Sequence, residues 1–312
     1  MKNVIVTGGT GFLGRNLIRR LCADNYHIYA VVRPESVNTD LLPKHENVTP
    51  VRCSLADLPA RADLFPADCD CFFHFAWGGV NREQINSEEI HSRSREDSLA
   101  AVQFALDHGV KCFIDAGSRS EYGAEKQMFR EDLECHPLVA YGRNKLKFYQ
   151  QAHAMCKGSG MRFIHARIFS VYGVDDHPWS LIYTAVSKMM RNQEMELSHC
   201  TQMWNFMDVR DTSDLFMTFF EKRDMIPGND NGIFNVATDD TRPLREFVEE
   251  IHRITNSTSE LKFGAFRQGA DSAMSILPDM TKVEKTFGWK ARISFSEGIR
   301  HLVEQMGEEN HA

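Results

Sequence analysis

Residues 4–14 read Val-Ile-Val-Thr-Gly-Gly-Thr-Gly-Phe-Leu-Gly, an apolar β-branched run that stops at a glycine cluster and leads at once into an apolar-periodic segment. This pattern predicts a strand, a tight turn and a helix. Gly8 would permit the turn, Gly11 the close approach of a pyrophosphate, and Gly14 the packing of the helix on the strand. An anion at this turn would lie at a helix N-terminus, where amide groups and the helix dipole favour negative charge. The stretch therefore predicts a dinucleotide-binding turn.

The length, charge and composition of the chain narrow its class. The chain has 312 residues, 42% of them apolar, and a net charge of −7 spread along the sequence. This distribution argues against a nucleic-acid or anionic-membrane binder, and no apolar run is long enough to span a bilayer. The N-terminus leads straight into a strand, so we expect no signal peptide and a cytoplasmic location.

The eight cysteines form no spaced framework, and most of them fall within apolar segments. Such cysteines are typical of reduced core thiols in a cytoplasmic protein. Cys69 and Cys71 could alternatively be metal ligands. The sequence has no second ligand pair that would complete such a site, so we expect no metal.

Strand and helix patterns alternate along the first half of the chain. Helical spacing covers residues 12–22, 87–108 and 141–156, and apolar runs predict further strands at residues 27–32, 48–53, 71–76 and 111–116. Alternating strands and helices indicate a parallel, doubly wound sheet. Ligands in such sheets bind beyond the carboxyl ends of the strands. The predicted fold class is α/β: a Rossmann doubly wound parallel sheet with a smaller C-terminal α/β substrate lobe.

The residue after the second strand bears on the choice of dinucleotide. An acidic residue there hydrogen-bonds the 2′-hydroxyl of NAD, whereas a nearby arginine accommodates the 2′-phosphate of NADP. This chain has Arg33-Pro34-Glu35 and no acid at the strand end. NADP(H) is therefore the expected cofactor, with NAD(H) as the alternative. In a second interpretation Arg33 only covers the adenine face or points into solvent.

Three polar residues stand where the chemistry is expected. Tyr141 and Lys145 share one face of a predicted helix, one turn apart. A nearby ammonium group lowers a tyrosine pKa, which would make Tyr141 a usable general acid or base. Ser118 follows the fifth strand on the ligand side, where it could hydrogen-bond a substrate oxygen. The alternatives are a solvated helix face for the pair and a turn or cap role for the serine.

With these residues in place, the chain resembles the extended short-chain dehydrogenases/reductases, also called the NAD-dependent epimerase/dehydratase family, over nearly its whole length. Residues 7–14 look like the family's TGxxGxxG turn, and residues 74–77 (His-Phe-Ala-Trp) resemble its H-L-A-A segment. Residues 118–123 resemble its S/T-x-x-x-Y-G loop, which places the catalytic hydroxyl at Ser118. Tyr141 and Lys145 match the catalytic YxxxK. Residues 167–173 are similar to the family's R-x-x-N-V-Y-G. Three short motifs near the family's C-terminus also have counterparts: D-x-x-K at Asp279 and Lys282, L-G-W at residues 288–289, and E-G-I at residues 297–299.

The resemblance implies roles for these residues. Tyr141 would protonate or deprotonate a substrate oxygen while a hydride moves to or from the nicotinamide. Lys145 would hold the nicotinamide ribose and lower the Tyr141 pKa, and Ser118 would bind the same substrate oxygen. It also implies a nucleotide-diphosphate sugar as substrate and a homodimer joined by a four-helix bundle. A related small carbonyl substrate without phosphate is the alternative, given Trp204. The expected cofactor-binding residues are Gly8, Gly11, Phe12, Leu13, Gly14, Arg33, Ser54, Leu55, Phe75, Ala76, Trp77, Tyr141 and Lys145. Residues 1–172 would form the dinucleotide-binding domain, and residues 173–312 mostly the substrate lobe, with segments returning to the sheet.

Departures from the family pattern narrow the reaction. Dehydratases follow the catalytic residue with Asp-Glu, whereas this chain has Arg119 and Ser120, so dehydration is not expected.

Trp204 replaces the arginine that contacts the substrate diphosphate, and it can stack on a ring but cannot neutralise phosphate. Arg267 resembles a second diphosphate-binding arginine, with an exposed loop residue as the alternative. Ser170 replaces the family's asparagine. The expected substrate-binding residues are Trp77, Ser118, Arg119, Ser170, Trp204 and Arg267.

Three functions follow from these patterns. The favoured one is an NADP(H)-dependent reductase of a keto group on a nucleotide-activated sugar, of the 4-keto-6-deoxy type, because no acid follows the second strand and the dehydratase acids are missing. The alternative is an NAD-dependent nucleotide-sugar epimerase, which the catalytic residues fit equally well. A third is a non-catalytic dinucleotide sensor on the same fold, which would have no need of Tyr141 and Lys145.

Overall fold

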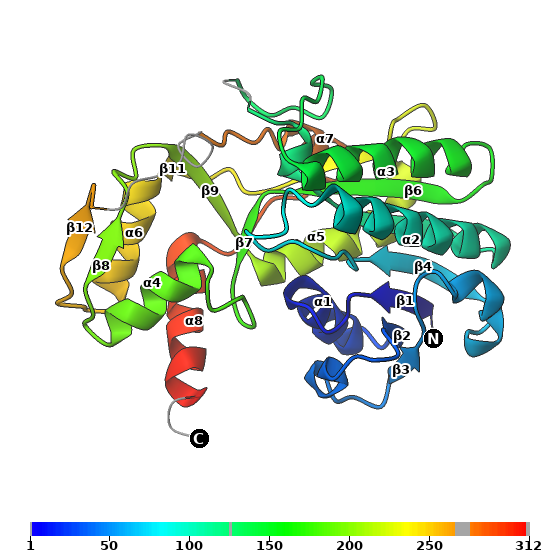
Figure 1. The fold of residues 1–312 in the computed structure, drawn as a ribbon, viewed down its shortest axis with the longest axis horizontal. Coiled ribbons are helices and arrows are strands. Elements are labelled where there is room, and N and C mark those ends of the chain that lie inside the picture. Colours follow the sequence, from blue (N-terminus) through cyan, green and yellow to red (C-terminus); the bar gives the residue numbers. More distant parts are fainter. Residues whose placement is uncertain (1, 125–126, 266–274, 310–312) are drawn as a thin grey trace.

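A computed structural model describes residues 2–124, 127–265 and 275–309. Its main body is a seven-stranded sheet, all of whose paired strands run parallel, in the order β10-β6-β5-β4-β1-β2-β3 (Figure 1). The strands are β1 (Asn3–Thr7), β2 (His27–Val32), β3 (Val48–Arg52), β4 (Cys69–His74), β5 (Cys112–Ser118), β6 (Arg162–Ile168) and β10 (Ile233–Val236). This is the predicted Rossmann-like α/β fold.

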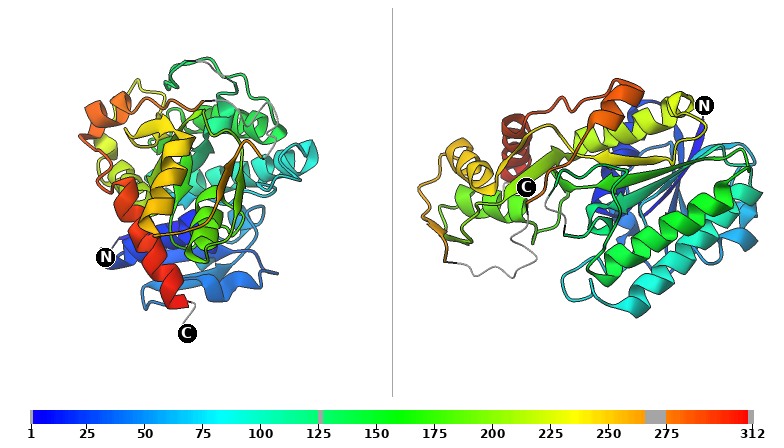
Figure 2. Two further views of the ribbon diagram at one scale, coloured as in Figure 1. Left: turned by 90° about the vertical axis from the view of Figure 1, so that its left-hand side faces the viewer. Right: turned by 90° about the horizontal axis from the view of Figure 1, so that it is seen from above.

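Helices cover both faces of this sheet (Figure 2). One face packs against α1 (Phe12–Ala23) and α5 (Val209–Glu221), and the other against α2 (Glu88–Asp107) and α3 (Ala140–Cys156). α1 forms a helix because Leu17, Ile18 and Leu21 recur at helical spacing and are buried against the sheet. The helix α7 (Thr281–Phe287) packs beside β10.

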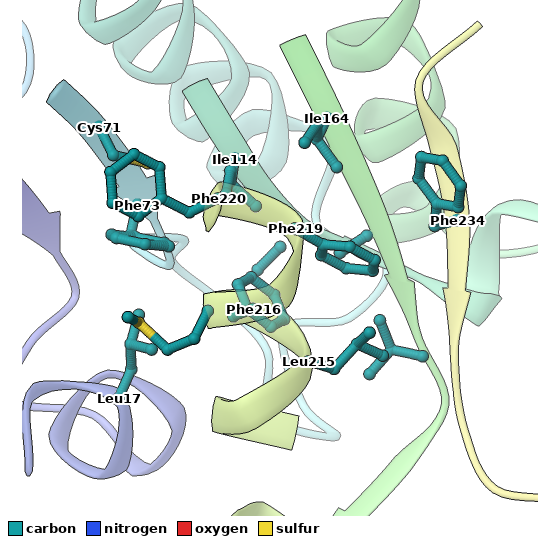
Figure 3. Close-up of a cluster of buried hydrophobic side chains, with 14 of the residues drawn as sticks. Leu17, Cys71, Phe73, Ile114, Ile164, Leu215, Phe216, Phe219, Phe220 and Phe234 are labelled. Carbon is teal, nitrogen blue, oxygen red and sulfur yellow. The ribbon is translucent and has the colours of Figure 1, made fainter. Parts of the chain in front are cut away.

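Aromatic side chains of α5 fill much of one interface with the sheet (Figure 3). Phe216, Phe219 and Phe220 are fully buried there. The Phe219 ring lies 5.4 Å from that of Phe234 on β10, and the Phe220 ring lies 6.0 Å from that of Phe73 on β4. Burial of large aromatic side chains of this kind is a dominant contribution to core stability.

The smaller lobe is built from segments of the second half of the chain. Its three-stranded sheet has the order β11-β9-β7, its two-stranded sheet pairs β12 with β8, and its helices bury Ile182, Phe247 and Ile299 in a separate apolar cluster. The elements are β7 (Ser170–Tyr172), α4 (Leu181–Met190), β8 (Met195–Leu197), β9 (Met203–Asp208), β11 (Thr241–Pro243), α6 (Leu244–Ile254), β12 (Leu261–Phe263) and α8 (Phe295–Glu309).

The fourth strand lies two residues earlier than its apolar run predicts. We expected residues 71–76, whereas β4 covers Cys69–His74. The strand starts early because Cys69 pairs with Asn3, and Asp70 within it pairs with Lys111. It ends early because β1 turns away at Gly8, and the Phe75 ring packs 4.9 Å from Phe216 of α5. The apolar character of residue 75 thus reflects packing against a helix.

None of the eight cysteines, all of which lie in the described ranges, forms a disulfide. Across residues 2–124, 127–265 and 275–309, no helix combines the length and apolar character needed to cross a membrane. The same residues contain no cluster of histidine, cysteine, aspartate or glutamate side chains able to hold a metal ion.

Candidate active site

The glycine turn between β1 and α1 leaves no room for side chains on its inner side. Gly8 has a φ of +70°, and a Cβ atom there would lie 2.8 Å from the backbone nitrogen of Ala76. A Cβ atom on Gly14 would lie 2.3 Å from the carbonyl oxygen of Gly8. Both positions therefore require glycine, the first for its backbone conformation and the second for the contact between helix and turn.

The N-terminus of α1 has the features of an anion site. Gly11 is its N-cap residue, and no side chain caps the first turn. Amide groups of that turn are left to meet a ligand, and the helix dipole favours negative charge there. The residues present thus fit the pyrophosphate of a dinucleotide, with Gly11, Phe12 and Leu13 at the helix start and Phe75 and Ala76 across the turn. Their roles as cofactor ligands stay a prediction.

The residues expected around the adenosine end lie at the ends of β2 and β3. The Arg33 side chain is 77% exposed, and its nearest described carboxylate, that of Glu35, lies 3.9 Å away. Ser54 donates a hydrogen bond of 2.6 Å to Asp57, and Leu55 is half-buried beside it. Arg33 is therefore accessible to a ligand, in line with the prediction of a 2′-phosphate contact, which stays a prediction.

The structure brings Ser118, Tyr141 and Lys145 together. Ser118 is the last residue of β5, and its side chain lies close enough to Tyr141, at the start of α3, to lower the pKa of that phenol. The Nζ atom of Lys145 donates to the carbonyl oxygen of Ala116 at 2.7 Å. The Trp77 ring lies over this ammonium group, with its centroid 4.0 Å from Nζ. Spacing on the helix and the end of the strand thus position the three groups as predicted.

The expectation that Lys145 lowers the Tyr141 pKa is wrong for the chain without bound ligand. Burial raises the pKa of Tyr141, the charges of Glu121 and Asp115 raise it further, and only the hydrogen bond from Ser118 lowers it. The physical reason is that Lys145 has a counter-ion, because its Nζ lies 3.8 Å from Oδ1 of Asp115. Burial lowers the pKa of Lys145 itself, and the same carboxylates oppose that effect.

A buried charge network lies directly behind this pair. His165 on β6 contacts Asp115 through Nδ1 and Glu121 through Nε2, both at 2.9 Å. Arg167, two residues further along β6, donates from Nε to Glu121 at 3.0 Å. Glu121 in turn accepts a hydrogen bond of 2.7 Å from the backbone N–H of Ser118. Every one of these side chains is at most 2% exposed.

Sequence analysis did not identify Asp115, Glu121 or His165 as functional. The available signal was a charged or titratable side chain within two largely apolar strands, Asp115 in β5 and His165 in β6. Such residues need buried partners. Only the register, in which Asp115 lies beside His165, shows which partners they have.

The predicted substrate-binding residues Ser170, Trp204 and Arg119 also lie close together. Trp204 Nε1 on β9 donates to the Ser170 hydroxyl on β7 at 3.0 Å. The Arg119 guanidinium lies 5.6 Å from the centroid of the Trp204 ring. Burial lowers the pKa of Arg119, and no carboxylate of the described ranges lies within ion-pair distance of it. Arg267 falls outside the described residues.

Trp77, which is predicted to meet both cofactor and substrate, contacts side chains of α2 and α3. Its indole N–H donates to His91 on α2 at 3.1 Å, and its ring meets that of Tyr141 edge-on at 6.2 Å. A separate cavity of about 410 Å³ lies between α1, α5 and α8, away from the strand ends. Its arginines Arg19 and Arg210 are already paired with Asp175 and Asp208.

Comparison with known proteins agrees with this geometry. The family model for the NAD dependent epimerase/dehydratase family matches residues 4–237. The chain belongs to this family, whose members are enzymes. It is 23% identical over 323 residues to UDP-arabinose 4-epimerase 1 of Arabidopsis thaliana, covering 93% of this chain and 75% of that protein.

Solved structures share the fold over almost all of their length. UDP-glucose 4-epimerase of Thermotoga maritima, solved with UDP-glucose, superposes with a TM-score of 0.84 at 22% identity, covering 99% of each chain. MoeE5, solved with UDP-glucose and NAD, superposes with a TM-score of 0.83 at 23% identity, covering 99% of each chain.

Proposed function

We propose that this chain is a nucleotide-sugar epimerase that inverts one hydroxyl-bearing sugar carbon by oxidation and re-reduction with a tightly held NAD. The observation that carries the proposal is the convergence of Ser118, Tyr141 and Lys145 beside the glycine turn, with no carboxylate at the two positions after Ser118. The named relatives support it, because the plant protein and the Thermotoga protein are both 4-epimerases of UDP-sugars.

Tyr141 would act as the general acid and base at the substrate oxygen. Its phenolate oxygen would accept the proton of the sugar hydroxyl as the ketone forms, and the same phenol would return the proton in the second half-reaction. The Ser118 hydroxyl, which lies beside Tyr141, would hold the substrate oxygen in position. A bound nicotinamide supplies the hydride acceptor and later the hydride donor for this chemistry.

The position of Lys145 assigns it two tasks. Its hydrogen bond to the Ala116 carbonyl fixes the ammonium group at the edge where the nicotinamide ribose is expected. Its positive charge, one helical turn from Tyr141, favours the phenolate once a ligand occupies the cleft. The Trp77 ring shields this charge from solvent on one side.

Loss of water from the sugar does not fit this site. Dehydration requires an acid and a base in addition to Tyr141, and the positions that supply them in the resembling dehydratases hold Arg119 and Ser120. A guanidinium group remains protonated at every physiological pH and so cannot serve as the base.

The substrate proposed here is a nucleotide-diphosphate sugar. The faces of Trp204 and Trp77 suit stacking against a base or a sugar ring. Arg119, which has no carboxylate partner in the described part of the chain, supplies a positive charge next to Ser118 for an anionic group of the substrate.

Net reduction of a keto sugar with NADP(H) is the second candidate, and the sequence alone favours it. The observation behind it is Arg33, whose exposed side chain follows β2 where an NAD-binding chain would carry an acid. The relatives favour the epimerase instead, and MoeE5 was solved with NAD. A homodimer, which the family resemblance implies, also stays a prediction.

One experiment separates the two candidates. The purified protein is denatured, the released dinucleotide is identified, and the intact protein is assayed with UDP-glucose and UDP-glucuronic acid for product epimers. Co-purified NAD with epimer formation in the absence of added cofactor supports the proposal. An empty protein that binds NADPH far better than NADH, and that reduces 4-keto nucleotide sugars, would replace it with the reductase.

A further inference from the structure

His165 occupies an unusual position for a strand residue, because both of its ring nitrogens meet carboxylates. Nδ1 lies 2.9 Å from Asp115 and Nε2 lies 2.9 Å from Glu121, and the ring is fully buried. An ionised carboxylate only accepts hydrogen bonds, and a neutral imidazole has one N–H donor. The Nε2 contact with Glu121 is a hydrogen bond, whereas Nδ1 lies beside Asp115 without an aligned hydrogen bond. A lone pair on Nδ1 would face the Asp115 carboxylate at 2.9 Å and be repelled by it, so the two contacts together favour a proton on both nitrogens, the imidazolium form.

The two carboxylates contact different residues of the proposed Ser118, Tyr141 and Lys145 site. Glu121 accepts the backbone N–H of Ser118, and so fixes the residue whose hydroxyl meets Tyr141. Asp115 faces Lys145, with Oδ1 3.8 Å from Nζ. His165 is therefore the group that joins the serine side of the site to the lysine side.

The charges of this network balance differently with and without the imidazole proton. Asp115 and Glu121 are two negative charges, and Lys145, Arg167 and a protonated His165 are three positive ones, so the set is left with one positive charge. With a neutral His165 the set has no net charge, and Lys145 serves only as the counter-ion of Asp115.

We propose that His165 is a positioning residue for the acid–base pair: as an imidazolium bridging Asp115 and Glu121 it neutralises one buried carboxylate, so that the charge of Lys145 acts on Tyr141 once the dinucleotide is bound. The proposal rests on the function proposed above, in which Tyr141 is the acid–base group. It assigns His165 no contact with substrate or cofactor.

The groups around His165 are consistent with its positive charge. Asp115 on β5 and Glu121 after β5 face it, Arg167 follows it on β6, and Lys145 and the Tyr149 ring approach from α3. Opposite it on β10 stands the apolar Ile233. Burial lowers the pKa of His165, but the charge of Glu121 and the contacts with Asp115 outweigh burial and raise it.

His74 provides a matched control within the same sheet. Strand register places His74, Asp115 and His165 side by side on β4, β5 and β6. The partners of His74 are hydroxyl groups, at 2.8 Å from Thr7 and 2.9 Å from Ser98, and burial lowers its pKa to about 4. His74 is thus a neutral histidine on the other side of the same aspartate.

The test is a pH titration of Tyr141 in the NAD⁺-saturated protein. The titration is monitored by carbon-13 NMR of tyrosines labelled at the oxygen-bearing ring carbon. The resonance that disappears in Tyr141→Phe is assigned to Tyr141. In His165→Gln we expect the Tyr141 midpoint to rise by at least about one pH unit, the size of shift a nearby charge produces. In His74→Gln, which removes no charge, we expect the midpoint to stay in place.

A folded His165→Gln protein with the wild-type midpoint overturns the proposal. So does a wild-type Tyr141 that titrates together with the other tyrosines, since Lys145 would then have no effect for His165 to maintain. If His165→Gln does not fold, nitrogen-15 NMR of the wild-type histidines decides instead, with His165 assigned through its contact with the Tyr149 ring. Imidazolium shifts at neutral pH support the proposal, and a neutral tautomer overturns it. No sugar is needed for these measurements, so a failure of epimerase turnover is recognised separately.

Discussion

The ammonium group of Lys145 lies 3.8 Å from the carboxylate of Asp115, and both side chains are buried behind the catalytic cleft. The aspartate charge raises the pKa of Tyr141 and partly offsets the charge of the lysine. Asp115→Asn removes that opposition, so we expect Tyr141 to lose its proton at lower pH, by on the order of one unit. The pH dependence of turnover with saturating substrate measures the shift. Asp70→Asn, which removes the partner of the exposed Lys111, serves as control. An unmoved profile in Asp115→Asn would show that the aspartate charge does not reach the tyrosine.

Tyr141→Phe removes the hydroxyl that carries the substrate proton. We expect kcat to fall by about 10²–10⁴-fold, the range attributed to a single general acid–base group. Tyr149→Phe is the control, because this tyrosine lies on the same helix and its hydroxyl donates to the carbonyl of Asn231, away from Ser118. Equal activity of the two variants would contradict the assignment of Tyr141.

Gly14→Ala places a methyl group 2.3 Å from the Gly8 carbonyl oxygen. The carbonyl oxygen is a backbone atom and cannot rotate away as a side chain could, so the start of the helix must shift. We therefore expect dinucleotide affinity to fall by about tenfold or more, which corresponds to about 1.4 kcal/mol of binding free energy. Isothermal calorimetry with NAD⁺ measures this. Gly228→Ala, where nothing lies within 4 Å of the new Cβ atom, should bind as the wild type does. Retained affinity in Gly14→Ala would place the pyrophosphate elsewhere.

Arg119→Met keeps the length of the side chain and removes its charge. We expect weaker binding of UDP-sugars, with a rise in KM of about tenfold, within the range for a lost hydrogen bond to a charged group. Binding of UDP, UDP-glucose and UDP-glucuronic acid locates the contact. Equal losses for all three indicate the diphosphate, and a loss confined to UDP-glucuronic acid indicates a sugar carboxylate. Unchanged affinity for every ligand would exclude Arg119 from substrate binding.

His74 makes stability depend on pH in a defined window. Its pKa is about 4 in the folded chain against 6.5 for an ordinary histidine, so both states are neutral above pH 6.5. Between pH 6.5 and 4 only the unfolded chain takes up the proton, and stability falls as the pH falls, by up to about 3 kcal/mol. His74→Gln should flatten the dependence in this window. Urea unfolding at several pH values measures it, and parallel curves for the two proteins would rule out this effect.

The sequence allowed the Rossmann half to be predicted well, because its signals are local. The bounds of β2 match the predicted run, and each bound of α1 and α3 lies within one residue of the predicted bound. Ser118, Tyr141 and Lys145 could be identified because strand ends and helical spacing locate them without tertiary information. The displaced β4 shows the limit, since an apolar run does not distinguish packing in a sheet from packing of Phe75 against α5.

The electrostatics of the site could not be predicted in this way. Lys145 was expected to lower the Tyr141 pKa because only the helix spacing of the two residues was known. The opposing charge of Asp115 depends on the register of β5 beside β6 and on the depth of burial, which are properties of the folded sheet. The contact between Trp204 and Ser170 likewise depends on the pairing of β7 with β9.

The seventh strand of the sheet, β10, has a consequence for how the chain is made. It joins the edge at β6 only after the polypeptide has passed through β7, α4, β8, β9 and α5. While a ribosome is still producing those segments, β6 is an open edge and the apolar face later covered by Phe216, Phe219 and Phe220 is bare. Open edges and bare apolar faces promote aggregation. The nascent chain should therefore need chaperone protection until residue 236 has emerged, and residues 1–172 expressed alone should aggregate.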